Sequence, residues 1–245
     1  MRPDAMSDRR PEPSATGLFV DRADAGRRLL DRLRASARGG TAGPAAPLVL
    51  AIPRGGVELG AVIARGLDAE LDVVLARKLR APHQPELALG AVSEDGTVYL
   101  NDFVERMPDV TAAVIEAERR RQLGEIERRR RLYRAVRPQA SIAGRRVILT
   151  DDGIATGATL GAGLRTVREA GAAWIVVAVP VAAPERLAAI RPLCDEVVCL
   201  LAPDDFQAIG QFYGSFAPVP DERVMDLLRE CGRPAAAAAG GHAPG

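Results

Sequence analysis

The chain has 245 residues, of which 33 are Lys or Arg and 32 are Asp or Glu, so its formal net charge is +1. A chain of this length can bury a full core, which predicts one large domain with tails. The balanced charge argues against a general attraction to nucleic acid or membrane surfaces, and no apolar run is long enough to span a bilayer. Cys194, Cys199 and Cys231 lack metal-site spacing and are typical of reduced thiols. We therefore expect a cytoplasmic protein with neither nucleic acid nor a membrane as partner.

The two ends of the chain differ in composition from its middle. Residues 1–16 are rich in Arg, Asp, Pro and Ser, and residues 233–245 are mainly Ala, Gly and Pro. Such segments have too little apolar surface to pack, so both are predicted to be disordered. The folded domain is expected within residues 17–232, beginning with an amphipathic helix over about 21–38.

The first buried strand is predicted over residues 48–52. It leads into Pro53-Arg54-Gly55-Gly56, and a helical pattern follows this loop. A loop between a parallel strand and a helix presents free N–H groups at the positive end of the helix dipole, which suits an anion. Arg54, Gly55 and Gly56 are therefore candidate ligand-binding residues, and an ordinary strand-to-helix turn is the alternative.

A second apolar strand is predicted over residues 71–76, ending in Arg77 and Lys78. Cations at the tip of a buried strand are costly unless they reach water or an anion. Residues 79–86 have two prolines and little apolar content, which predicts an exposed loop able to close over a site. His83 in this loop is either a proton donor, an anion ligand or simply solvated.

A hairpin and a long helix come next. Residues 87–100 alternate like two strands around a turn at 94–96, and residues 110–136 are helical with Glu and Arg four apart. The interleaved glutamates indicate that the Arg run at 128–131 is an exposed face rather than an RNA-binding surface. Ile126 and Tyr133 form a packing seam, which leaves a homodimer open.

The most informative stretch is residues 147–159. An apolar run, Val147 to Leu149, is followed by Asp151 and Asp152, then by a small, hydroxyl-rich loop that opens the next helix. The loop amides, with Thr156 and Thr159, can hold a phosphate. Two carboxylates would repel that phosphate but can accept hydrogen bonds from the hydroxyls of an attached sugar. The stretch thus predicts a ribose 5-phosphate site, and a capped turn is the alternative.

Strands and helices continue to alternate, with a helix at 159–170, strands at 174–181 and 196–201, and a short helix at 184–190. This order predicts an α/β fold with a parallel sheet flanked by helices on both faces. Residues 203–220 break the pattern and concentrate aromatic side chains, so we expect a small hood there. Phe206, Phe212 and Tyr213 either stack on a flat base or pack the hood onto the sheet.

The string from 147 to 159 resembles the phosphoribosyl-diphosphate (PRPP) binding signature of type I phosphoribosyltransferases. Residues 18–231 also resemble a group of uncharacterised bacterial phosphoribosyltransferases that share Pro-Arg-Gly-Gly, Arg-Lys-Leu and Asp-Asp-Gly-Ile-Ala-Thr-Gly. The resemblance implies that fold, PRPP as donor and Mg²⁺ bound through Asp151 and Asp152, but it does not supply the acceptor. We expect the acceptor to be a small nitrogenous base whose identity the sequence leaves open. Ala155 stands where hypoxanthine-guanine enzymes carry an Asp, and Gly153 replaces a commoner apolar residue.

The resemblance, together with the patterns above, also assigns expected roles to individual residues. The expected catalytic residues are Asp151, Asp152, Lys78 and His83. The expected substrate-binding residues are Arg54, Gly55, Gly56, Arg77, Ala155, Thr156, Gly157, Ala158, Thr159, Phe212 and Tyr213. Two alternatives remain: a non-catalytic ligand sensor of the same fold, and a PRPP hydrolase without a base pocket.

Overall fold

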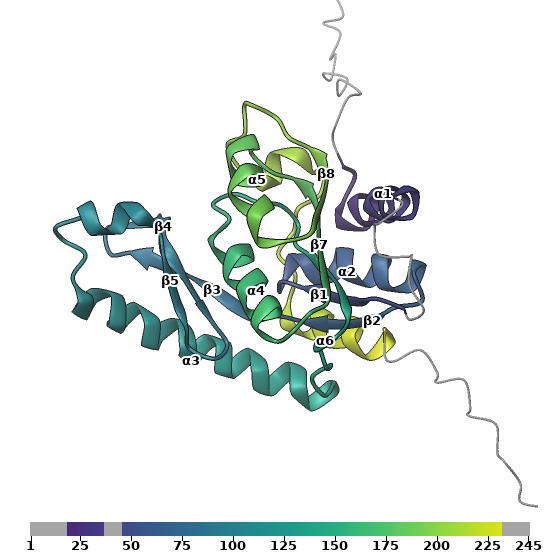
Figure 1. The fold of residues 1–245 in the computed structure, drawn as a ribbon, viewed down its shortest axis with the longest axis horizontal. Coiled ribbons are helices and arrows are strands. Elements are labelled where there is room, and N and C mark those ends of the chain that lie inside the picture. Colours follow the sequence, from purple (N-terminus) through teal and green to yellow (C-terminus); the bar gives the residue numbers. More distant parts are fainter. Residues whose placement is uncertain (1–18, 37–45, 232–245) are drawn as a thin grey trace, which may run out of the picture.

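The computed structural model describes residues 19–36 and 46–231, with only the backbone of Pro85 and Glu86. The predicted disordered ends at 1–16 and 233–245 lie outside the described residues. The described part forms a body around a parallel sheet, with an arm projecting from it (Figure 1). None of its helices is both long and apolar enough to cross a membrane.

Five strands of the described chain form the central parallel sheet, in the order β2-β1-β6-β7-β8. Their bounds are β1 (Leu48–Ala51), β2 (Glu70–Val73), β6 (Arg146–Thr150), β7 (Trp174–Val181) and β8 (Glu196–Leu201). β1 pairs in register with both β2 and β6, so its carboxyl end lies beside theirs. The expected parallel sheet is confirmed.

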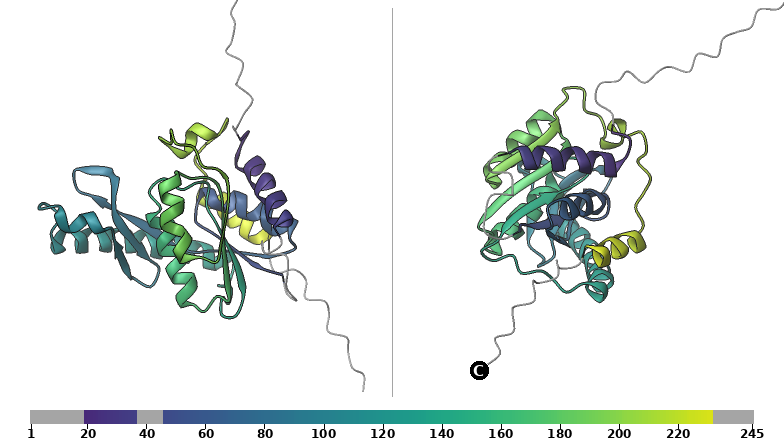
Figure 2. Two further views of the ribbon diagram at one scale, coloured as in Figure 1. Left: turned by 45° about the horizontal axis from the view of Figure 1, so that its top comes forward. Right: turned by 90° about the vertical axis from the view of Figure 1, so that its right-hand side faces the viewer.

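Helices cover both faces of this sheet, because successive strand residues point to opposite sides. Val49 and Ile148 pack in one core cluster with α1 (Arg22–Ala35), α2 (Gly55–Gly66) and α6 (Asp221–Glu230). Leu50 and Leu149 pack in a second cluster with α4 (Ala158–Glu169) and α5 (Pro184–Ile190). Figure 2 shows α1 and α2 on one side of the sheet and α4 on the other.

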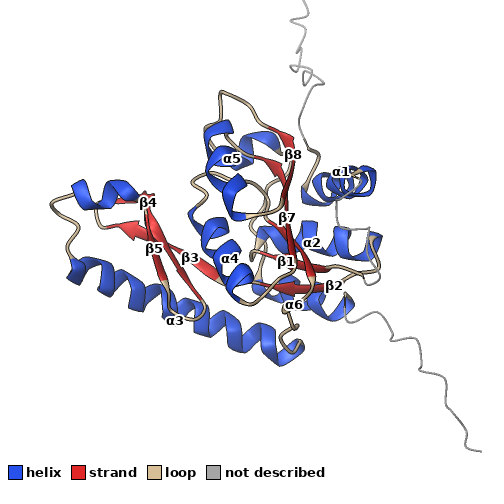
Figure 3. Cartoon of the chain, viewed as in Figure 1, coloured by secondary structure: helices blue, strands red, loops and turns tan. Residues whose placement is uncertain are grey.

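The arm is built on a second, antiparallel sheet of β3 (Ala76–Ala81), β4 (Gln84–Ser93) and β5 (Val98–Leu100). The turn η1 (Asp102–Arg106) connects it to α3 (Ala112–Val136), which runs along the arm and back under the body (Figures 1 and 3). The predicted hairpin at 87–100 and the long helix are both present. Ile126 and Tyr133 are buried within this chain's own core.

Two expectations for residues 71–86 are wrong. The strand predicted over 71–76 ends at Val73, and Ala76 begins β3 of the other sheet. Residues 79–86 are mostly strand, with a two-residue turn at 82–83, instead of an exposed loop. The reason is that burial alternates from one residue to the next, as in a strand with one solvated face. Leu79 and Ala81 are buried, and Arg80 between them is exposed on that face.

The hood, residues 203–220, is irregular apart from η3 (Ile209–Phe212), and a further short turn, η2 (Arg191–Leu193), follows α5. The hood lies beside the start of α1 (Figure 2). Phe19 forms a parallel bridge with Tyr213 there. The N-terminal end of α1 and the hood are therefore one packed unit above the sheet.

Candidate active site

Two adjoining cavities lie where β1 and β6 end. The smaller, about 150 Å³, is lined by the loop after β6, and the larger, about 300 Å³, by the loop after β1 and the start of β3. Lys78, Asp151 and Thr159 line both cavities. The two predicted anion loops thus face one crevice, at the carboxyl edge where open α/β sheets bind ligands.

The smaller cavity has the features of a phosphate cradle. Ala155, Thr156, Gly157 and Thr159 line it, and Ala158 begins α4 directly behind them. Gly157 has a φ of 78°, a left-handed conformation that favours glycine, and it lies at the N-cap of α4. Within the described chain, the N–H groups of Ala155, Thr156 and Gly157 have no hydrogen-bond partner. These free donors at a helix N-terminus suit an anion with several oxygens.

The acid pair lies at the junction of the cavities. The Asp152 N–H donates to Asp151 Oδ1 at 2.9 Å. Burial, and then the charge of Asp152, raise the pKa of Asp151 well above its ordinary value. Burial also raises the pKa of Asp152, against the opposing effect of Arg22. The environment therefore disfavours two full negative charges at once unless a hydroxyl donor or a cation joins the pair.

The glycines of the loop after β1 are needed for close approach. A Cβ on Gly55 would lie 1.9 Å from Asp152 Oδ2, and one on Gly56 would lie 2.9 Å from Asp151 Cα. Only a hydrogen fits at these positions, so the loop and the acid pair are packed directly against each other. The Pro53–Arg54 peptide is cis, and Arg54, at the N-cap of α2, lines the larger cavity.

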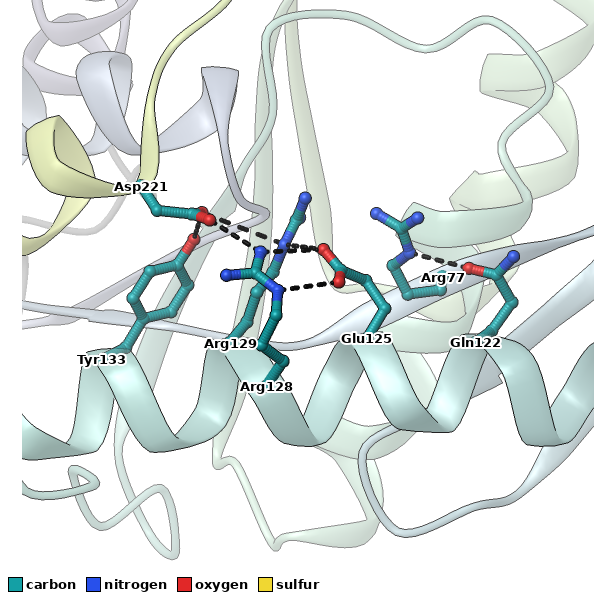
Figure 4. Close-up of polar contacts among 7 residues, drawn as sticks. All are labelled: Arg77, Gln122, Glu125, Arg128, Arg129, Tyr133 and Asp221. Atoms are coloured by element: carbon teal, nitrogen blue, oxygen red, sulfur yellow. Dashed lines mark hydrogen bonds and ion pairs between the residues drawn. The ribbon is translucent and has the colours of Figure 1, made fainter.

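The larger cavity is rich in cations, since Arg54, Arg77, Lys78 and Arg80 all line it. Arg77 on β3 is held by α3, because its Nε donates to Oε1 of Gln122 on that helix at 2.9 Å (Figure 4). Burial, followed by repulsion from Arg129, lowers the pKa of Arg77. A cavity with this lining suits a ligand that carries several negative charges.

The residues present fit Mg²⁺ only as a cation shared with a ligand. Among the described residues, no group of three or more His, Cys, Asp or Glu side chains could hold a metal ion. Mg²⁺ commonly uses one or two carboxylates together with substrate oxygens and waters. Asp151 and Asp152 provide that number of carboxylates beside the cavities.

His83 and the hood aromatics differ in their positions relative to the acid pair. His83 is exposed at the turn between β3 and β4 and lines neither cavity. Phe206 and Phe212 stack on each other, with their ring centroids 5.5 Å apart, and both remain partly exposed. Tyr213 is buried and its hydroxyl donates to the Asp152 carbonyl oxygen at 2.7 Å, so this ring packs the hood onto the site.

Two contacts, one of the acid pair and one of the glycine that follows it, join residues that are far apart in the sequence. Arg22 Nε donates to Asp152 Oδ2 at 2.9 Å, although 130 positions separate them. Ile209 of the hood lies over Gly153, where a Cβ would fall 2.8 Å from Ile209 Cγ2. This contact explains the unusual glycine after the acid pair. The aspartate N-cap of α1 was the available hint that Arg22 has a fixed place.

Comparison with known proteins agrees with this geometry. A family model described as "Phosphoribosyl transferase domain" matches residues 21–214. Two Mycobacterium tuberculosis sequences, named "Putative phosphoribosyl transferase" Rv0571c and MT0597, are 44% identical over 211 residues, covering 86% of this chain and 46% of each relative. The chain thus spans about half the length of these curated relatives.

One solved structure is similar to this chain in both sequence and fold. The crystal structure of TT1426 from Thermus thermophilus is 44% identical, with a TM-score of 0.72, over 88% of this chain and 99% of that one. The segment matched by the family model includes both anion loops and the acid pair between them. The chain belongs to the phosphoribosyl transferase family.

Proposed function

We propose that the protein transfers ribose 5-phosphate from PRPP to a small nitrogenous base, with release of diphosphate. The observation that carries the proposal is the acid pair at the junction of two anion-binding cavities. A phosphate site on one side and a cation-rich site on the other match the two charged ends of PRPP. The carboxylates between them match its ribose hydroxyls.

Each part of the site has a task in such a reaction. The free amides at 155–157 and the hydroxyls of Thr156 and Thr159 hold the 5-phosphate. Asp151 and Asp152 accept hydrogen bonds from the ribose hydroxyls, which orients the sugar as its anomeric carbon gains oxocarbenium character. The cations of the larger cavity stabilise diphosphate as the bond to C1 breaks and negative charge accumulates on the leaving group.

Mg²⁺, when bound, neutralises part of the diphosphate charge and orients its oxygens. Asp151 and Asp152 are the residues that would hold it. His83 stays a candidate for contacting diphosphate, as predicted from the sequence, and its exposed position requires the β3–β4 turn to bend toward the crevice.

The acceptor is expected on the hood side of the crevice. Phe206 and Phe212 are partly exposed rings of the hood, and a flat heteroaromatic ring can stack on them. Ala155 cannot accept a proton or a hydrogen bond through its side chain. A purine acceptor therefore receives no assistance from a side chain at that position.

PRPP hydrolysis is the second candidate function. It is favoured by the burial of Tyr213, one of the three candidate rings for stacking on a base, because that burial reduces the aromatic surface available to an acceptor. In this reaction water attacks C1, and diphosphate leaves without a base.

One experiment separates the possibilities. The protein is incubated with PRPP, Mg²⁺ and a panel of purine, pyrimidine and other nitrogenous bases, and diphosphate release is followed. Release that depends on one base supports transfer, and base-independent release supports hydrolysis. Binding of PRPP by calorimetry without any release would identify a sensor, and no binding at all would contradict the proposal.

A further inference from the structure

Arg22 occupies a fixed position at the start of α1. It is the first residue of the helix, and Asp21 caps that helix by accepting the Asp24 N–H at 2.7 Å. Its side chain is only 8% exposed. A guanidinium that is so deeply buried must be matched by acceptors, because an unpaired buried charge is strongly destabilising.

The partners of Arg22 come from three separate parts of the chain. Its Nε donates to Asp152 Oδ2 at 2.9 Å, and its Nη1 donates to the Ala217 carbonyl oxygen at 2.8 Å. The guanidinium also lies 3.9 Å from the ring centroid of Phe216, and Glu58 on α2 is 3.8 Å away. One side chain thus connects the signature carboxylate to the hood.

The backbone strengthens the same connection. Residues 19–20 form a short ladder with residues 212–215 of the hood, through the bonds Phe19 N to Phe212 O (2.8 Å), Gly214 N to Phe19 O (2.7 Å) and Ser215 N to Val20 O (2.9 Å). The Tyr213 hydroxyl adds a direct bond to the Asp152 carbonyl oxygen. We refer to residues 19–22 with 212–217 as the hood seam. It ends on Asp152.

The ion pair has little room to move. A Cβ at position 55 would lie 1.9 Å from Asp152 Oδ2 and 2.8 Å from Arg22 Nε, so the loop after β1 closes over the pair. A bidentate or multi-partner arginine in such a space fixes direction as well as charge. The free choice of rotamers that an exposed Asp152 would have is therefore removed.

We propose that Arg22 is a positioning residue: its guanidinium orients Asp152 toward the ribose of the donor and at the same time holds the hood in place. The inference rests on the proposed function for its kinetic part only. The orientation of the acid and the placement of the hood are coupled, because the same guanidinium satisfies both. Loss of this side chain therefore weakens donor binding and loosens residues 212–217 together.

The first measurement is PRPP affinity by titration calorimetry with Mg²⁺, using Arg22→Ala, Arg22→Lys and a control, Arg27→Gln. Arg27 is an exposed cation of the same helix whose partner, Asp24, lies 3.6 Å away. We expect the Kd of Arg22→Ala to rise about tenfold or more, and that of Arg27→Gln to stay within about twofold. Arg22→Lys keeps a positive charge but not the planar fork that contacts Asp152 and Ala217 together, so its Kd should rise by about threefold or more, less than that of Arg22→Ala. A merely structural role would lower the binding stoichiometry and leave Kd unchanged.

The second measurement is amide hydrogen exchange of residues 212–217 in the ligand-free protein. We expect about tenfold faster exchange or more in both Arg22→Ala and Arg22→Lys, because lysine cannot bond Ala217 and cover Phe216 while it pairs with Asp152. Unchanged exchange in Arg22→Ala would overturn the inference, and so would unchanged Kd where wild type binds PRPP. If wild type binds no PRPP, the proposed function falls, and the exchange measurement still decides whether Arg22 fixes the hood.

Discussion

At the scale of single residues, Asp152 has the most constrained surroundings in the crevice. Arg22 holds its carboxylate at 2.9 Å, and Tyr213 donates to its carbonyl oxygen at 2.7 Å. Its neighbour Asp151 has an environment that raises its pKa further. The pair is therefore asymmetric, and Asp152, which Arg22 contacts directly, is the better candidate for the charged acceptor of a ribose hydroxyl.

Asp152→Asn should lower PRPP turnover by about tenfold or more, because it removes a charge-assisted hydrogen bond to the sugar. Diphosphate release at saturating and limiting PRPP measures the effect, with Asp205→Asn in the exposed part of the hood as the control. Turnover equal to that of wild type would rule out the ribose assignment.

Gly55→Ala should impair donor binding and also lower the free energy of unfolding, because it disrupts the buried Arg22–Asp152 pair. Its methyl group would lie 1.9 Å from Asp152 Oδ2, so the acid must turn away from its present position. Gly124→Ala is the matched control, because nothing lies within 4 Å of its Cβ and it occupies the middle of α3. The control should gain about 0.5–1 kcal/mol in the free energy of unfolding. PRPP calorimetry and urea unfolding give the two quantities, and a normal Kd in Gly55→Ala would show that the carboxylate need not stay where it is.

At the scale of elements, α3 joins the arm to the site through a line of polar contacts (Figure 4). Gln122 holds Arg77 of the larger cavity, and Glu125 binds Arg128 and Arg129 at 2.8 and 2.9 Å. Tyr133 donates to Asp221 of α6 at 2.6 Å. The helix that the sequence presents as a charged outer surface therefore also fixes one of the cavity's cations.

Glu125→Gln should reduce stability in a pH-dependent way. The hydrogen bond from Arg128 is the main cause that lowers the pKa of Glu125 from 4.5 to about 2. A depressed folded-state pKa gives stability that is fully present above the unfolded value of 4.5 and is lost as pH falls toward 2. We expect a loss of about 1 kcal/mol at neutral pH, since the pair is partly exposed.

Urea unfolding at several pH values between neutral and acid checks this expectation. The difference between wild type and Glu125→Gln should shrink as the pH falls below 4.5. Glu127→Gln is the control, because Glu127 is 44% exposed and its pairs with Arg130 and Arg131 lie in solvent. A difference that stays constant with pH would mean that the charge of Glu125 contributes nothing.

At the scale of the whole molecule, the arm and the body share one core. Ile126 and Tyr133 of α3 belong to the same buried cluster as Val49 and Ile148 of the central sheet. A continuous apolar core predicts that arm and body unfold together, even though the arm projects in Figure 1.

Ile126→Ala should therefore lower the stability of the whole protein by about 2–4 kcal/mol, because it leaves a cavity at a residue that is 2% exposed. Trp174 fluorescence reports on the body, and far-ultraviolet circular dichroism is dominated by the helices, including α3. Both signals should change at one shifted midpoint. Two separate transitions, with only the dichroism shifted, would show that the arm is an independent unit.

Much of the fold follows from local patterns in the chain. Apolar runs of strand length, each followed by a loop and an amphipathic stretch, predict a parallel sheet with helices on both faces, and β7, α5 and β8 have the predicted bounds. The signature around Asp151 and Asp152 also predicts where the phosphate loop and the acid pair lie. In these segments burial, spacing and chemistry all agree within a few consecutive residues.

The remaining features depend on contacts between distant residues, so local patterns do not reveal them. Arg77 and Lys78 belong to a strand of a second sheet, because β4 supplies their hydrogen-bonding partner further along the chain. The Arg22–Asp152 pair spans 130 positions, and Gly153 is small because Ile209 lies over it. The sequence by itself determined the element order and predicted the two anion loops and the acid pair, because each depends on neighbouring residues. Only the tertiary structure decided how the acid is held and where the hood sits, since those depend on side chains that meet when the sheet closes.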